Sequence, residues 1–251
     1  MSQHQHIHGI VLRKKTYFDS SELITILTAE HGKILSVAKN SQSSKSPFCG
    51  RLEPGYEVRG VLFEGRQTYH LNEVDIVSPL AAQTSSLPAQ SAQFYLFEFL
   101  DRLLPENDAC PALFSLLRET LGLTAKETNK LPILITAFIF KFLTIQGFMA
   151  SWKTCSKSNL ALSEHDSLYL HHADASVVLQ HHADYEDTPL PFPVVKWVNY
   201  LQHYPITDTL RVIPSELEQR YTWSVIHLIL ERLLSKPLHS EAFLVESLRS
   251  F

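Results

Sequence analysis

Residues Glu22 to Lys39 read ELITILTAEHGKILSVAK, and this stretch decides the fold. Two β-branched apolar runs, Leu23 to Leu27 and Ile34 to Val37, flank a polar link that contains Gly32. The pattern predicts two strands joined by a short hairpin, in which the glycine can supply the positive φ that such a turn needs. The chain then enters a loop, Lys39 to Pro47, that carries lysines and no acidic residue. A cationic loop held by a strand pair suits contact with phosphates.

Further strand-like runs surround this hairpin. Ile7 to Leu12 precedes it, and Tyr56 to Phe63 and Thr68 to Ile76 follow it before Pro79. Five short strands joined mostly by hairpins predict a small barrel, and the five-stranded OB-fold is the commonest such barrel that binds oligonucleotides.

Downstream of Pro79 the apolar period changes from two to that of a helix. The helix candidates are residues 91–104, 111–121, 131–146, 192–203, 216–234 and 241–249. We therefore predict an α+β protein with an OB-fold nucleic-acid-binding domain at residues 1–80 and an all-helical domain at residues 81–251.

The composition is that of a soluble globular protein, with 45% hydrophobic and 19% charged residues in 251. The net charge of −4 means that any nucleic-acid binding must come from local clusters of Lys and Arg. The most apolar run, Leu131 to Ile145, contains Pro132 and Lys141 and is shorter than the ~20 apolar residues that span a membrane. With no signal-peptide pattern at the start and three well-separated cysteines, the prediction is a cytoplasmic protein without a membrane partner.

The segment from about 151 to 193 fits neither period. It carries Cys155 and the histidines His165, His171, His172, His181 and His182. Because Cys and His are the usual zinc ligands, a zinc site is the most specific hypothesis for this segment. However, it contains no Cys-x-x-Cys or His-x₃-His pair. The prediction is an ordinary surface loop and no metal site.

Enzyme motifs are absent. The chain contains no phosphate-binding glycine loop, no His-Glu-x-x-His and no Gly-x-Ser-x-Gly. We therefore predict no catalytic residue, no cofactor and a binding protein.

Several motifs together resemble the RecO family of bacterial recombination mediators. They are Gly9-Ile10-Val11-Leu12-Arg13, Asp19-Ser20-Ser21-Glu22-Leu23, Leu27 to Lys33, Val37-Ala38-Lys39, Leu52-Glu53-Pro54, Lys236 to Ser240 and Phe243-Leu244. The resemblance implies an OB barrel followed by a helical domain, and a protein that binds single- and double-stranded DNA and anneals complementary strands. It also implies two partners, RecR and the acidic C-terminal tail of single-strand-binding protein, in loading the recombinase, and no catalysis.

The chain departs from that family in two places. Many relatives carry a zinc module of two Cys-x-x-Cys pairs; here the first pair falls at Cys155 to Ser158 with one cysteine, and the second near Leu179 to His182 with none. Residues 151–193 are thus a degenerate zinc-module region, and no metal is carried over. Relatives are also rich in arginine after the residue that matches Lys39, where this chain has Asn40, Ser41, Gln42 and Ser43.

The predicted DNA-binding residues are cations in or beside the barrel loops, with aromatic residues available to stack on bases. The cations are Arg13, Lys14, Lys15, Lys33, Lys39, Lys45, Arg51 and Arg66, and the aromatic residues are Tyr17, Phe18 and Phe48. Phe18 and Phe48 could equally close the ends of the barrel. The rival functions are a protein-interaction adaptor without direct DNA binding and a metal-dependent hydrolase that uses the histidine-rich segment.

Overall fold

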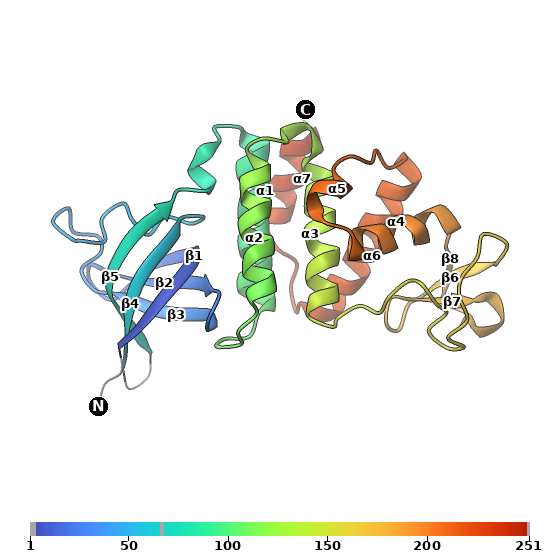
Figure 1. Ribbon diagram of the computed structural model, residues 1–251, viewed down its shortest axis with the longest axis horizontal. Coiled ribbons are helices and arrows are strands. Elements are labelled where there is room, and N and C mark those ends of the chain that lie inside the picture. The colour runs from blue at the N-terminus through green and yellow to red at the C-terminus, as the bar shows by residue number, and fades with distance from the viewer. Residues whose placement is uncertain (1–3, 66–67, 250–251) are drawn as a thin grey trace. The chain divides into compact units, whose positions relative to one another are not determined.

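A computed structural model of the chain describes residues 4–65 and 68–249 (Figure 1). Five strands form its N-terminal part. They are β1 (His4–Tyr17), β2 (Ser21–Thr28), β3 (Gly32–Ala38), β4 (Glu57–Glu64) and β5 (Tyr69–Ser78).

These strands close into a barrel in the order β1-β2-β3-β5-β4. The long β1 makes closure possible, because its first half pairs with β4 and its second half with β2. The strand crosses from one partner to the other at Gly9, where a Cβ atom would lie 2.5 Å from the Ile26 side chain. The parallel pairing of Ser36–Ala38 with Tyr69–Leu71 completes the ring. The predicted barrel is confirmed, with β2 and β3 at the hairpin predicted from Glu22 to Lys39.

The apolar side chains that alternate along the strands point inward and fill the barrel. Inward-facing residues such as Ile24, Ile26 and Ile34 are at most 1% exposed, and they form one apolar cluster with Val58 and Leu62. Burying each such side chain stabilises the fold by roughly 1.5–3 kcal/mol, so the barrel has a complete core of its own.

Helices make up most of the remainder. They are α1 (Leu87–Leu103), α2 (Pro111–Thr124), α3 (Leu131–Ile145), α4 (Phe192–His203), α5 (Ile206–Thr209), α6 (Glu216–Leu233) and α7 (His239–Arg249). Local chemistry sets several of their starts. Proline occupies the first turn of α1, α2 and α4, where its missing N–H has no intrahelical partner to lose. Ser215 and Glu218 form a capping box at the start of α6.

Residues 168–189, for which the sequence predicts no regular element, contain a small sheet. Its strands are β6 (Leu168–His171), β7 (Ser176–Leu179) and β8 (Thr188–Pro189), in the order β7-β6-β8. All four residues of β7 are buried. The strand therefore shows no apolar alternation, and strands this short give little periodic signal.

Contacts divide the chain into two compact units. The first contains residues 1–131 and 238–251, and the second residues 132–237. This grouping places α1, α2 and α7 with the barrel and so differs from a division at residue 80. The stretch Thr128–Ile145 is long and apolar enough to cross a membrane, but 61% of it is buried, as in the core helix of a soluble protein.

Candidate nucleic-acid interface

Two loops of the barrel are joined by hydrogen bonds on one side of the sheet. Ser20 Oγ donates to Asn40 Oδ1 at 3.0 Å, and Gln42 N donates to the Ser20 carbonyl oxygen at 3.0 Å. Gln42 Nε2 also donates to Thr16 Oγ1 at 3.1 Å. The turn between β1 and β2 and the loop after β3 therefore form one continuous surface, although about twenty residues separate them along the chain.

A surface pocket of about 280 Å³ lies on this surface. Tyr17 and Phe18 line it from the β1–β2 turn, Lys39 and Asn40 from the loop after β3, and His70 from β5. Phe18 is 77% exposed and its ring centroid lies 4.6 Å from that of Tyr17. In OB-folds the β2–β3 face and the loops between β1 and β2 and between β4 and β5 bind oligonucleotides, and Phe18 of the pocket lies in the first of these loops. An exposed aromatic pair beside a lysine offers both base stacking and a phosphate contact. Asp19, which also lines the pocket, is its acidic member.

Three of the predicted cations lie exposed near these loops. In the part of the chain that the structure describes, no ion pair or side-chain hydrogen bond occupies the ammonium groups of Lys15, Lys39 and Lys45. Lys15 shares a face of β1 with Tyr17, since alternate residues of a strand point the same way. Their charge is therefore available for an anionic ligand.

Four other predicted cations have protein partners. Arg13 pairs with Asp101 at 3.0 Å, Lys14 with Glu53 at 2.6 Å, and Arg51 with Asp75 at 3.2 Å. Lys33 Nζ donates to the Asp101 carbonyl oxygen at 2.6 Å. Any phosphate contact by these residues must compete with those partners, although exposed ion pairs are worth only ~0–1 kcal/mol.

The remaining predicted residues fall in two classes. Phe48 is 6% exposed and belongs to the barrel core. Of the two roles predicted for it, base stacking and closing the barrel, this position fits the second. Little of the Phe48 side chain is therefore accessible to a base, unlike that of Phe18. Arg66 lies outside the described residues.

Two pocket residues, Asn40 and His70, were not among the predicted DNA-binding residues. His70 is far from the hairpin in sequence, and only the parallel pairing of β3 with β5 brings it beside Lys39. The prediction of a five-stranded barrel included no strand order, so nothing in it placed the start of β5 next to the end of β3.

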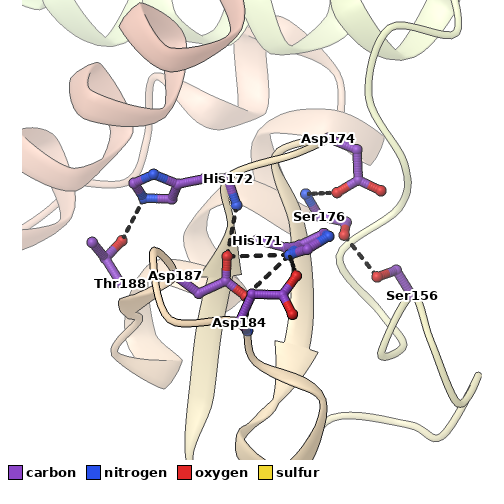
Figure 2. A network of polar contacts seen from close by, with 8 residues as sticks. All are labelled: Ser156, His171, His172, Asp174, Ser176, Asp184, Asp187 and Thr188. Carbon is purple, nitrogen blue, oxygen red and sulfur yellow. Dashed lines mark hydrogen bonds and ion pairs between the residues drawn. The ribbon is translucent and has the colours of Figure 1, made fainter.

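The histidine-rich segment folds around its small sheet in the second unit (Figure 2). His171 is buried at the end of β6 and its Nδ1 lies 3.0 Å from Asp187 Oδ2. Burial raises the pKa of Asp187, but hydrogen bonds from the His172 and Asp184 N–H groups and the contact with His171 outweigh it, so the pKa is held below its usual value. Cys155 is buried, and it forms no cluster of metal-ligand type with His181 or His182 among the described residues.

Comparison with known proteins gives the family. The family model for recombination protein O N terminal matches residues 1–80, and that for recombination protein O C terminal matches residues 85–242. The DNA repair protein RecO of Symbiobacterium thermophilum is 30% identical over 149 residues, which are 59% of each chain. That of Myxococcus xanthus is 34% identical over 150 residues, 59% of this chain and 61% of the relative. The match thus spans about three fifths of the length of these relatives. Because the two family models together cover most of the chain, this protein belongs to the recombination protein O family of DNA repair proteins.

Proposed function

We propose that this protein is a non-catalytic mediator of DNA repair and homologous recombination that binds single- and double-stranded DNA through its barrel. The observation that carries the proposal is the pocket where Tyr17, Phe18 and Lys39 meet. Stacking of bases on exposed rings is independent of sequence, because every base has a π-face. Contacts from lysines to phosphates are also independent of sequence.

Strand annealing follows from the same surface. Two complementary strands repel each other through their phosphates, and cations that neutralise both strands lower that repulsion without reading the bases. Lys15 and Lys45 extend the positive charge beyond the pocket. We propose that this protein anneals complementary strands in the cytoplasm and helps to load recombinase onto strands coated by single-strand-binding protein.

The proposed partners are RecR and the acidic C-terminal tail of single-strand-binding protein. Their support is family membership alone. Fluorescence anisotropy of a labelled tail peptide, with and without its acidic residues, tests the second partner. Co-elution of purified RecR on size-exclusion chromatography tests the first.

The decisive experiment measures binding of an unstructured oligothymidine by fluorescence anisotropy at low and moderate salt. We expect saturable binding that weakens as salt rises. Lys39→Gln should weaken binding, whereas Lys196→Gln, at an exposed position of α4 far along the chain, should not. Undetectable binding at low salt would remove the DNA-binding function.

One observation favours the rival function of an interaction adaptor. A groove of about 550 Å³ in the second unit is lined by Arg220, Tyr221 and His227 of α6 and by His172 and Thr188. The Arg220 guanidinium beside Tyr221 and Leu228 suits a peptide with an acidic side chain next to an apolar one, although Glu231 also lines the groove. If the oligonucleotide fails to bind while the tail peptide binds and Arg220→Gln abolishes that binding, the adaptor function replaces the DNA-binding one.

A further inference from the structure

Two segments of the second unit bring three metal-ligand side chains together. His171 ends β6, and the chain returns through Asp184 and Asp187 before β8. Figure 2 shows the imidazole of His171 facing both carboxylates. Nδ1 lies 3.0 Å from Asp187 Oδ2 and 3.6 Å from Asp184 Oδ2. Across the described residues, this is the one group of three such side chains whose ligand atoms all lie within 4.8 Å of one another.

Two of the three side chains are held rigidly before any ligand arrives. The His171 side chain is 5% exposed and that of Asp187 is 1% exposed. The backbone N–H of His172 donates to Asp187 Oδ1 at 2.9 Å, and that of Asp184 to Oδ2 at 2.8 Å. Each carboxylate oxygen accepts bonds at more than one lone-pair position, so these donors orient Asp187 without using all of its capacity. Fixed ligands of this kind reduce the entropy lost on binding.

The third side chain leaves the site open to solvent. Asp184 is 73% exposed, so an ion can enter and water can complete its coordination. The neighbouring His172 is directed elsewhere, because its Nε2 lies 3.3 Å from Thr188 Oγ1 (Figure 2).

The spacing of the ligand atoms fits a small divalent ion. Zinc binds histidine nitrogen and carboxylate oxygen at ~2.0–2.2 Å in a tetrahedron, so two of its ligand atoms lie roughly 3.4 Å apart. The observed distances of 3.0 and 3.6 Å lie on either side of that value. An imidazole ligand favours zinc, cobalt or nickel over magnesium or calcium, which prefer all-oxygen sites.

We propose that His171, Asp184 and Asp187 form a binding site for one divalent transition-metal ion, with Zn²⁺ as the best fit and water as the fourth ligand. The bound ion joins β6 to the segment before β8 and so stabilises the small sheet of the second unit. The site contains no cysteine and does not depend on the DNA-binding function of the barrel.

The test titrates Co²⁺ into the chelator-treated full chain and follows the visible absorption of the ion, with Zn²⁺ as competitor. We expect saturation at one equivalent, displacement by Zn²⁺, and no charge-transfer band from a thiolate. Zn²⁺ should raise the melting temperature of the wild type. Asp184→Asn should weaken metal binding at least tenfold while leaving the melting temperature of the metal-free protein unchanged, because the side chain is mostly exposed.

Matched controls locate the ion. His165→Gln alters a neighbouring histidine that is 87% exposed, and a His4→Gln/His6→Gln double variant alters two of the three histidines of β1. Both variants should bind Co²⁺ as the wild type does. The proposal is wrong if no saturable absorption develops, which leaves His171 and Asp187 as a plain ion pair. It is equally wrong if the signal disappears with His4 and His6, or with Cys155→Ser, because the ion would then lie elsewhere.

Discussion

The ammonium group of Lys33 donates a hydrogen bond to the carbonyl oxygen of Asp101, 2.6 Å away in the last turn of α1. Carbonyl groups in the last turn of a helix have no intrahelical partner, and a cation there also interacts favourably with the helix dipole. The side-chain carboxylate of Asp101 also accepts a hydrogen bond from Arg13. Two of the cations predicted to bind DNA thus link barrel strands to a helix of the same unit.

Replacing Lys33 should therefore affect folding more than DNA binding. We expect Lys33→Met to lower the free energy of unfolding by about 1–2 kcal/mol and to weaken oligonucleotide binding less than Lys39→Met does. Urea unfolding and fluorescence anisotropy measure the two effects on the same samples. A larger loss of affinity in Lys33→Met than in Lys39→Met would assign Lys33 to the interface instead.

The salt dependence of oligonucleotide binding tests whether Lys15, Lys39 and Lys45 contact phosphates. For single strands the slope of log K against log salt is roughly −0.7 per phosphate contact. The triple variant Lys15→Gln/Lys39→Gln/Lys45→Gln should therefore reduce the slope by about 2 if each lysine contacts one phosphate. A slope equal to that of the wild type would show that DNA binds elsewhere.

Phe18 and Phe48 should respond to alanine in opposite ways. Phe18 is 77% exposed, so Phe18→Ala should change the free energy of unfolding by less than about 0.5 kcal/mol. It should weaken single-strand binding by ~1–3 kcal/mol through lost stacking. Phe48 is 6% exposed, so Phe48→Ala should cost about 3–5 kcal/mol of stability. Normal affinity in Phe18→Ala would leave the exposed ring without a role in binding.

The barrel was predictable because its signals are local. Strand alternation and turn residues between Ile7 and Ile76 specify five strands, and their number and spacing indicate a small barrel. The strand order, which depends on the non-local pairing of β1 with β4 and of β3 with β5, was not predicted. Helix ends were also predictable where a proline marks the first turn. The helix predicted at residues 192–203 is observed as α4 (Phe192–His203).

The partners of charged side chains were not predictable. Nothing in the residues around Lys33 or Arg13 indicates Asp101, because that contact depends on how α1 packs against the barrel. The small sheet was missed for a different reason: its strands are two to four residues long, and β7 is buried throughout. His171 therefore looked like one of several surface histidines, whereas its burial beside Asp187 distinguishes it.

Alanine substitutions at Gly32 and Gly50 distinguish the cost of backbone strain from the cost of steric overlap. Both have positive φ, +69° and +70°, which L-residues adopt at a cost of roughly 1–2 kcal/mol. A Cβ atom at Gly32 would lie 2.0 Å from the Asp108 carbonyl oxygen, whereas one at Gly50 has no neighbour within 4 Å. We expect Gly50→Ala to lose only the strain energy and Gly32→Ala to lose more than about 3 kcal/mol. Equal losses, measured by urea unfolding, would mean that the hairpin moves away from Asp108 without cost.

Glu98 holds the start of α7 against α1 and gives the first unit a dependence on pH. Its carboxylate accepts hydrogen bonds from the backbone N–H groups of His239 and Ser240, at 2.9 and 2.8 Å, and from Ser240 Oγ at 2.6 Å. Burial raises the pKa of Glu98, but these bonds outweigh it and hold the pKa below its ordinary value of 4.5. The ionised form is therefore the one that stabilises the fold.

Because the pKa of Glu98 is lower in the folded state, its contribution is complete above about pH 5 and declines as pH falls through the folded pKa. Glu98→Gln should lower the free energy of unfolding by about 1–2 kcal/mol at neutral pH, and the difference from the wild type should shrink in acid. Glu164→Gln is the control, since that carboxylate is 73% exposed and should alter stability little at any pH. Urea unfolding between pH 7 and pH 3 measures both variants. A Glu98→Gln deficit that stays constant or grows in acid would mean that the lost interaction is packing of the side chain, because packing does not titrate with the carboxylate.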